Sequence, residues 1–230
     1  MIKYSKGTVF NANAQAMVNT INCTGVMGAG IALEFMLRYP KMFNEYKAQC
    51  AQQNIEIGKV SYFDDEQTTI VNFPTKWHFK YPSKLEWIEQ GLNNFVSTYA
   101  QHDITSIAFP KLGTLNGGLE WMQVKILMEK YLSQINAEVI ICLDELKEAE
   151  GLEKDMLSFF NTLSLAEIGN IVKLNAIQKN KIKSKSPLER FWHLSKIDGV
   201  GLLTYSKIFT FCYDAVKNKE KVFQQITMFD

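Results

Sequence analysis

The sequence predicts an α/β fold of three layers, in which helices cover both faces of a mixed sheet. Two observations carry this prediction. Short apolar runs alternate with longer amphipathic stretches, and within those stretches apolar residues recur every three or four positions. The chain has 230 residues, 47% hydrophobic and 21% charged, which suits one globular domain with an appendage. This composition excludes a disordered chain, a collagen and a pure coiled coil.

The predicted elements follow one another through the first half of the chain. Met1 opens directly onto an alternating pattern that is typical of a strand. Further apolar runs predict strands, which lie at 16–21, 60–63, 69–73, 106–109 and 138–143. Stretches with helical periodicity lie between them, at 28–39, 42–53, 83–99 and 119–134. The resulting alternation favours parallel neighbours in the sheet, because parallel strands need a crossover, usually a helix.

Composition also bounds the class of protein. No apolar run approaches the roughly 20 residues that cross a bilayer, and no basic and apolar leader opens the chain, so we expect a cytoplasmic protein without a membrane partner. Cys23, Cys50, Cys142 and Cys212 lie far apart, and the three histidines do not cluster near them. We therefore expect no disulfide framework, no metal site and no cofactor.

Charge divides the chain unevenly. Residues 1–170 carry 14 Lys+Arg and 19 Asp+Glu, a net charge of −5, whereas residues 171–230 carry 11 and 5, a net charge of +6. Between 173 and 185 the lysines are interleaved with Asn, Gln and Ser, a pattern typical of a solvated linker or of a surface that faces nucleic acid. The sequence thus predicts a domain at 1–150 and a basic helical extension at 151–230.

Three loops are candidates for a binding site, because ligands bind beyond the carboxyl ends of parallel strands. The loop at 19–32 passes three glycines before a helix begins, and the loop at 109–121 again runs through glycines into a helix. Glycines let backbone amides approach an anion, although tight turns also need them. The loop at 72–83 places Lys76 just beyond a strand end among aromatic residues. Together the loops favour a phosphorylated ligand.

In this order and spacing the three loops resemble the macrodomain family, and within it the DNA ADP-ribosyl glycohydrolase branch of DarG antitoxins. The resemblance covers roughly residues 1–145 and rests on VNTINCTGVMGAGIAL at 18–33, NFPTKWH at 72–78 and GGLEW at 117–121. It implies an ADP-ribose pocket on a three-layer α/β/α fold and metal-independent removal of ADP-ribose from a modified target. It also implies a cognate ADP-ribosyltransferase toxin as partner.

The resemblance assigns roles to individual residues. Lys76 corresponds to the catalytic lysine, which attacks the anomeric carbon as a neutral amine or, if protonated, stabilises developing charge. Asn22 corresponds to the asparagine that holds the distal ribose. The implied ligand-binding set is Val9, Asn22, Gly28, Gly30, Ile31, Thr75, Gly113, Thr114, Leu115, Asn116, Gly117 and Gly118.

The chain departs from the family pattern at both ends of the expected ligand. Thr8 stands where many macrodomains have an aspartate that binds adenine, so adenine must rely on backbone contacts or on another side chain. Gly117 stands where terminal ADP-ribose glycohydrolases have an acidic partner. Glu120 lies three residues further on, where it is either a carboxylate favoured by a helix start or a catalytic group.

Trp77 is a further departure, since DarG proteins tend to have arginine at this position. With Phe79 and Tyr81 it either offers a stacking face for an extruded base or packs into the core. Residues 191–208 of the extension resemble a helix-hairpin-helix that contacts a DNA phosphate, and the alternative is an ordinary helix pair. The predicted DNA contacts are Trp77, His78, Lys80, Lys196, Gly199, Gly201 and Lys207.

The sequence therefore predicts a hydrolase that removes ADP-ribose from modified DNA bases, with ADP-ribosylated DNA and single-stranded DNA as partners. Two alternatives stay open. One is a non-catalytic module that only binds ADP-ribose, and the other is a hydrolase of ADP-ribosylated protein or of ADP-ribose esters. The last six residues, 225–230, also resemble a sliding-clamp-binding peptide.

Overall fold

The structure is a computed structural model that describes the backbone of residues 1–227 and the side chains of residues 1–218. The chain divides into two compact units, Met1–Glu145 and Leu146–Asp230. The clamp-binding peptide predicted at 225–230 lies outside the residues whose side chains are described. No helix within the described residues is long and apolar enough to cross a membrane.

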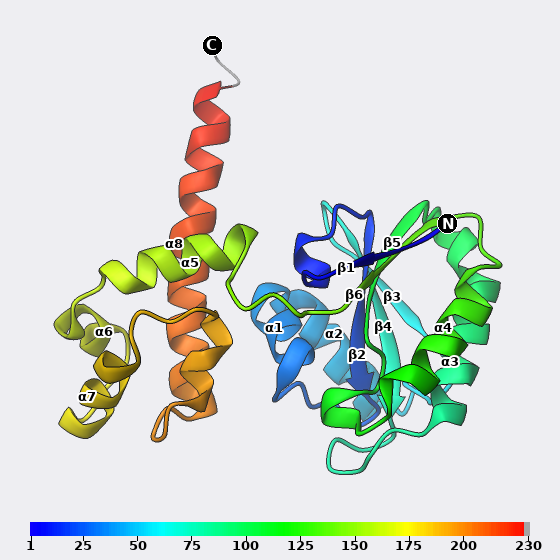
Figure 1. Cartoon of the computed structure of the whole chain (residues 1–230), viewed down its shortest axis with the longest axis horizontal. Helices are drawn as coiled ribbons and strands as arrows, with labels where there is room; N and C mark the ends of the chain where they lie inside the picture. The colour runs from blue at the N-terminus through cyan, green and yellow to red at the C-terminus, as the bar shows by residue number, and fades with distance from the viewer. Residues whose placement is uncertain (228–230) are drawn as a thin grey trace. The chain divides into compact units, whose positions relative to one another are not determined.

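Within residues 1–227, six strands form one mixed sheet in the order β1-β6-β5-β2-β4-β3. Its neighbours are parallel except for β3, which pairs antiparallel with β4 at one edge. The mixed sheet predicted from the alternating pattern is thus confirmed. The strands are β1 (Ile2–Ser5), β2 (Ala16–Asn22), β3 (Ser61–Asp64), β4 (Thr69–Lys76), β5 (Ser106–Pro110) and β6 (Glu138–Cys142) (Figure 1).

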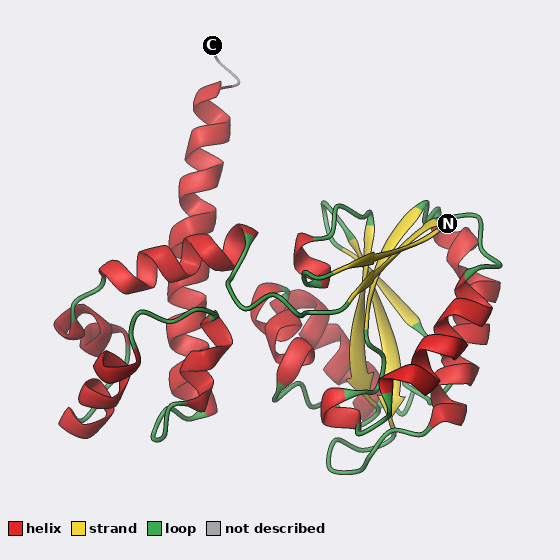
Figure 2. Cartoon of the chain, in the orientation of Figure 1, coloured by secondary structure: helices red, strands yellow, loops and turns green. Residues whose placement is uncertain are grey.

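Helices cover both faces of this sheet, as the three-layer prediction requires (Figures 1 and 2). One face carries α1 (Gly30–Arg38) and α2 (Pro40–Ala51), and the other carries α3 (Leu85–Thr98) and α4 (Trp121–Leu132). Each face has its own cluster of buried side chains, and both clusters lie entirely within Met1–Glu145. Three short 3₁₀ helices complete the unit, at Val9–Asn11, Tyr99–His102 and Leu115–Gly117.

Helix α3 packs unusually close to β4. Its buried stripe includes Ile88, Leu92 and Phe95, in line with the apolar periodicity of the sequence. Gly91 lies on the same face, and a Cβ at this glycine would lie 2.5 Å from Phe73 Cε1. The absence of a side chain at Gly91 therefore lets α3 lie close to the strand that carries Lys76.

Strand β4 is longer than predicted, and the prediction that Lys76 lies beyond its end is wrong. The strand continues through Pro74 and Thr75 and ends at Lys76. Pro74 lacks a backbone N–H, and the pairing with β2 shifts after Ile21, so that Pro74 faces Ile21 and Lys76 faces Asn22. Thr75 is thus the extra residue of a β-bulge.

Helices joined by loops make up the described residues of the second unit, which contain no strand. Its elements are α5 (Gly151–Thr162), α6 (Leu165–Ile171), α7 (Ala176–Lys185), a 3₁₀ helix at Phe191–Lys196, and α8 (Leu202–Thr227). Arg190 and Glu153 form an ion pair in its interior, with 3.0 Å between Arg190 Nε and Glu153 Oε2. The same carboxylate accepts the backbone N–H of Phe191 at 2.7 Å. The extension therefore has an organised interior of its own.

Candidate active site

The candidate site lies at the carboxyl edge of the sheet. Strands β2, β4 and β5 are parallel neighbours in space, so the loops that follow them emerge at one edge. These are the three loops that the sequence singled out. The backbone N–H of Cys23 donates to the carbonyl oxygens of Lys76 and Trp77, at 3.1 and 3.2 Å, which ties the first loop to the end of β4.

Lys76 lies where these loops meet. The bulge at Thr75 interrupts the regular alternation of β4 just before Lys76, and bulges commonly re-aim a side chain in this way. The Lys76 Nζ donates a hydrogen bond to the backbone carbonyl of Asn116 in the second glycine loop. The side chain is partly buried, and this desolvation lowers the pKa of Lys76 below its ordinary value of 10.5.

The second glycine loop, residues 113–118, is closed by its own backbone. The N–H of Gly117 donates to the Thr114 carbonyl at 2.9 Å, and the N–H of Leu119 donates to the Gly113 carbonyl at 3.0 Å. Gly118 has a φ of +77°, a conformation that glycine adopts at little cost. The loop is therefore a preformed turn that ends at the start of α4.

The two glycine loops converge, as the sequence predicted for a ligand gripped at both ends. Gly30 begins α1 with a φ of +58°, and a Cβ there would lie 2.7 Å from the Asn116 side-chain nitrogen. Asn116 thus accepts the Lys76 hydrogen bond with its backbone carbonyl, and its side-chain amide lies next to Gly30. The structure brings Lys76, Asn116 and Gly30 together at the amino-terminal end of α1.

Asn22 shapes the first loop. Its Oδ1 accepts hydrogen bonds from the backbone N–H and the hydroxyl of Thr24, at 2.9 and 2.7 Å, and its Nδ2 donates to the Val26 carbonyl at 2.5 Å. The Tyr46 hydroxyl donates to the Asn22 carbonyl at 2.7 Å. The visible role of this amide is to organise the loop, and its contact with a ribose stays a prediction.

Several residues of the predicted ligand-binding set turn their side chains into the protein. Val9 is buried in the core, so only its backbone can meet a ligand. The hydroxyls of Thr75 and Thr114 bond to the carbonyls of Ile21 and Lys111, at 3.4 and 3.1 Å. Gly113 and Gly117 are buried as well, and Ile31 is partly buried. The exposed members of the set are Gly28, Gly30, Leu115, Asn116 and Gly118.

Sequence reasoning gave no role to Ser83, which supports the second loop. Its backbone N–H donates to the Gly117 carbonyl at 2.8 Å, and a Cβ on Gly117 would lie 2.5 Å from its hydroxyl oxygen. That hydroxyl is buried and has no hydrogen-bond partner among the described residues. Asn19 has a similar orphaned oxygen, although its Nδ2 donates to Asn72 Oδ1 at 2.9 Å. Asn19 and Asn72 pair in register on β2 and β4. Their presence in two of the sequence motifs was the signal that could have predicted this contact.

Two further departures from the family pattern have definite positions. Glu120 is the N-cap residue of α4 and is exposed, which is the helix-start position considered from the sequence. It lines a shallow hollow beside the second loop together with Lys111, Leu115 and Trp121. Thr8 is the N-cap residue of the first 3₁₀ helix, and its hydroxyl accepts a hydrogen bond from the side-chain Nδ2 of Asn11 at 3.4 Å.

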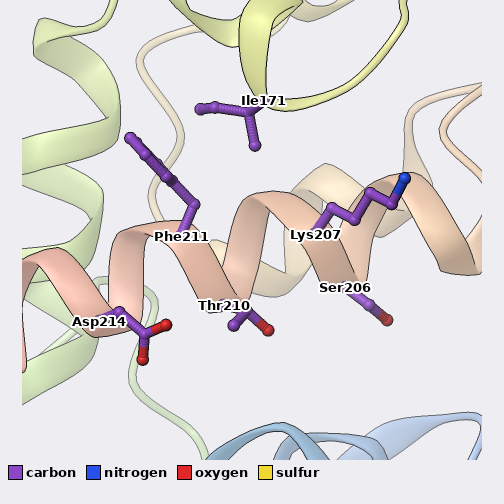
Figure 3. A pocket seen from close by; sticks show the side chains of 6 residues that line it. All are labelled: Ile171, Ser206, Lys207, Thr210, Phe211 and Asp214. Atoms are coloured by element: carbon purple, nitrogen blue, oxygen red, sulfur yellow. The ribbon is translucent and has the colours of Figure 1, made fainter.

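The predicted DNA contacts of the extension lie around the Gly-Val-Gly turn at 199–201. The first helix of the expected hairpin is a 3₁₀ helix that ends at Lys196, rather than an α-helix. Gln178 Nε2 donates to the Gly199 carbonyl at 2.6 Å, and Gly201 directly precedes α8. Lys207 lines a pocket on α8 with Ile171, Ser206, Thr210, Phe211 and Asp214 (Figure 3). DNA binding by these residues stays a prediction.

The chemistry available at the sheet edge is that of an amine and of backbone amides. Among the described residues no group of three His, Cys, Asp or Glu side chains is placed to hold a metal ion. The fold and this edge define an α/β domain in which two glycine loops and the start of a helix lie next to a lysine of lowered pKa, an arrangement that favours a phosphorylated ligand.

Comparison with known proteins identifies the class. The family described as "Macro domain" matches residues 18–128. A DNA ADP-ribosyl glycohydrolase of Mycobacterium tuberculosis (strain ATCC 25618 / H37Rv) is 45% identical over 129 residues, which cover 54% of this chain and 37% of that protein. The solved macrodomain of Mycobacterium tuberculosis DarG is 41% identical with a TM-score of 0.60, over 62% of this chain and 98% of that structure.

A second similar structure, Thermosipho africanus DarTG in complex with ADP-ribose, is 31% identical with a TM-score of 0.61, over 66% of this chain and 44% of that one. The chain belongs to the macrodomain family. It spans little more than a third, 37%, of the length of the Mycobacterium tuberculosis glycohydrolase that it matches.

Proposed function

We propose that the first unit removes ADP-ribose from a modified DNA base by cleaving the bond between the ribose anomeric carbon and the base. The observation that carries this proposal is the position of Lys76, which is partly buried between the two glycine loops and has a lowered pKa. The similarity to proteins named DNA ADP-ribosyl glycohydrolase supports the choice of reaction.

In the proposed complex, the ligand lies across the carboxyl edge of the sheet. Backbone amides of residues 113–118 and the start of α1 face the diphosphate, because amides and a helix N-terminus favour an anion. The loop organised by Asn22 faces the distal ribose, next to Lys76. Adenine lies toward Val9, whose buried side chain leaves backbone contacts to bind the base.

In the proposed reaction the neutral amine of Lys76 attacks the anomeric carbon. A bond forms between Nζ and this carbon, the bond to the base breaks, and the base leaves with the electron pair and takes up a proton. Water then attacks the same carbon, which releases ADP-ribose and restores the amine. Desolvation favours the neutral amine, so the partial burial of Lys76 supports this role over that of a permanent cation.

We also propose that an ADP-ribosyltransferase acting on DNA is the functional counterpart of this chain. The Thermosipho africanus (strain H17ap60334) relative, 32% identical over 157 residues, is named as a fusion of DNA ADP-ribosyl transferase and DNA ADP-ribosyl glycohydrolase. A transferase attaches ADP-ribose to DNA, and a glycohydrolase removes it. In this arrangement the basic second unit contacts the DNA strand on which the first unit acts.

A comparison of substrates tests the proposed function. The full chain is incubated with an oligonucleotide ADP-ribosylated on thymine, with a protein ADP-ribosylated on glutamate, and with an ADP-ribose ester, and free ADP-ribose is quantified by mass spectrometry. We expect the highest kcat/KM on the oligonucleotide. Faster release from the protein or the ester would assign the chain to those substrates instead. Tight binding of ADP-ribose without release from any of them would make it a binding module.

A further inference from the structure

Immediately after Lys76 the chain forms a turn of aromatic residues that are exposed. Trp77, Phe79 and Tyr81 keep 60%, 42% and 58% of their surface accessible. We call residues 77–81 the aromatic turn. The alternative that these rings pack into the core is therefore wrong. Apolar surface gathered in this way usually marks an interaction site.

The aromatic turn is ordered around His78. The His78 ring stacks on Phe79, with centroids 4.5 Å apart and planes 24° apart, and its centroid lies 5.2 Å from that of Tyr81. The backbone N–H of Lys80 donates to His78 Nδ1 at 3.2 Å, and the N–H of Tyr81 donates to the His78 carbonyl at 3.1 Å. The rings are thus presented to solvent by a defined turn.

The same segment carries positive charge without acidic residues. Residues 76–81 contain Lys76 and Lys80 and no Asp or Glu, whereas residues 1–170 as a whole have a net charge of −5. Lys80 Nζ lies 5.7 Å from the centroid of the Phe79 ring. Aromatic faces beside lysines suit a ligand that combines flat rings with phosphates.

We propose that the aromatic turn stacks unpaired bases that flank the ADP-ribosylated nucleotide of a single-stranded DNA. This inference rests on the proposed function, because it places the flanking strand next to Lys76. The bases of a duplex already stack on one another, so only a single strand offers free faces to Trp77 and Tyr81. Lys80 is placed to meet a phosphate of the same strand. The hydrogen bond from the Cys23 N–H to the Trp77 carbonyl holds the backbone of Trp77 beside the first loop of the site.

The test compares two substrates that differ only in the flanking strand: a thymine-ADP-ribosylated oligonucleotide and ADP-ribosylated thymidine monophosphate. Base stacking contributes about 1–3 kcal/mol per base, so Trp77→Ala is expected to lower kcat/KM on the oligonucleotide by about 5- to 150-fold. On the mononucleotide we expect a change below about twofold, since no flanking base is present there to stack. Trp77→Phe, which keeps a ring, should recover much of the loss. Met122→Ala, at another exposed apolar residue of the first unit, is the matched control.

Equal losses on both substrates, or no loss on either, would overturn the proposal. A second measurement keeps it testable if no turnover occurs at all: binding of an unmodified fluorescein-labelled oligonucleotide, followed by polarisation. We expect Trp77→Ala to bind the single strand more weakly than wild type, and wild type to prefer the single strand to its duplex. Unchanged affinity of Trp77→Ala for the single strand would contradict stacking by this turn. So would a second outcome, in which Trp77→Ala binds an ADP-ribosylated peptide more weakly than wild type but binds the oligonucleotide equally well.

Discussion

Lys76 combines two features that an ordinary surface lysine lacks. Its ammonium is partly desolvated, and its Nζ has a fixed hydrogen-bond acceptor in the Asn116 carbonyl. Desolvation disfavours the charged form, while the carbonyl orients the nitrogen. Catalysis by Lys76 as a nucleophile therefore depends on how much of this lysine is neutral at the working pH.

The pH dependence of turnover follows from the lowered pKa. If the neutral amine is the nucleophile, its fraction grows as the pH rises, so the rate should rise toward a plateau with a midpoint below 10.5, the ordinary lysine pKa. Single-turnover rates on the modified oligonucleotide between neutral pH and pH 10 measure this curve. A rate that falls over this range would show that the protonated lysine is the active form.

How far the sequence predicts the site differs from residue to residue. Lys76 is recognisable because a short motif surrounds it, and Gly30 and Gly113–Gly118 because glycine patterns are local. Ser83 was not found, because its contact with Gly117 joins positions that no sequence pattern connects. The exposure of the aromatic turn was equally undecided, since the same rings could have filled a core.

At the element scale, the second glycine loop depends on the absence of a side chain at Gly117. In Gly117→Ala the new Cβ would lie 2.5 Å from the Ser83 hydroxyl oxygen and 3.2 Å from Ser83 Cβ, so Ser83 or the loop must shift. We expect calorimetric titration to show about 5- to 150-fold weaker binding of ADP-ribose, because overpacking costs about 1–3 kcal/mol.

Two variants check this reading of the loop. Gly28→Ala, whose Cβ would meet only Val26 at 3.8 Å, should keep the thermal stability of the wild type. Adding Ser83→Gly to Gly117→Ala removes the obstructing side chain and should recover part of the affinity. Wild-type affinity in Gly117→Ala alone would show that the loop is not held by Ser83.

Helix α3 provides a test in which two effects oppose each other. Replacing Gly91 by alanine gains about 1 kcal/mol of helix propensity, but the new Cβ would lie 2.5 Å from Phe73 Cε1 in the core. Overpacking should win, with a net loss of up to roughly 2 kcal/mol in the free energy of unfolding. Urea denaturation measures it, with the exposed Asn93→Ala on the same helix as control. Stabilisation by Gly91→Ala would mean that the helix can move away from β4.

Apolar periodicity predicts where the elements of the first unit lie, but it does not predict the end of β4. The helices and strands of the first unit begin and end close to the predicted positions, because their buried faces repeat regularly. The end of β4 was misjudged because Pro74 is normally a signal against a central strand. Only pairing with β2 shows that a bulge accommodates the proline, and this pairing is a property of the folded sheet.

At the scale of the whole molecule, the two units have separate interiors. The uneven charge of the sequence suggested that the chain has two parts. The boundary between the two units follows from hydrogen bonds of the folded chain, which the sequence does not show. The N–H of Glu145 donates to the Lys6 carbonyl at 2.8 Å and so belongs with the sheet. Arg190 Nη1 donates to the Leu146 carbonyl at 2.9 Å, which places the next residue with the helical unit.

This separation predicts that damage to the second unit spares the first. Glu153→Ala leaves the buried Arg190 without its carboxylate, which should destabilise the second unit by about 3–5 kcal/mol. Calorimetry should show an early unfolding transition in the full chain, while affinity for ADP-ribose is unchanged. Asp155→Ala, exposed on the same helix, is the control. Loss of ADP-ribose binding in Glu153→Ala would contradict the independence of the units.

The most direct measurement of the central claim is release of ADP-ribose from a thymine-ADP-ribosylated oligonucleotide by wild type, Lys76→Ala and Lys76→Arg. If Lys76 is the nucleophile, wild type releases ADP-ribose, and both variants release it at least about 100-fold more slowly. Arginine keeps the charge but cannot supply a neutral amine. The exposed Lys59→Ala should behave as wild type. Unimpaired release by Lys76→Ala would refute a catalytic lysine, and activity in Lys76→Arg would assign it a purely electrostatic role.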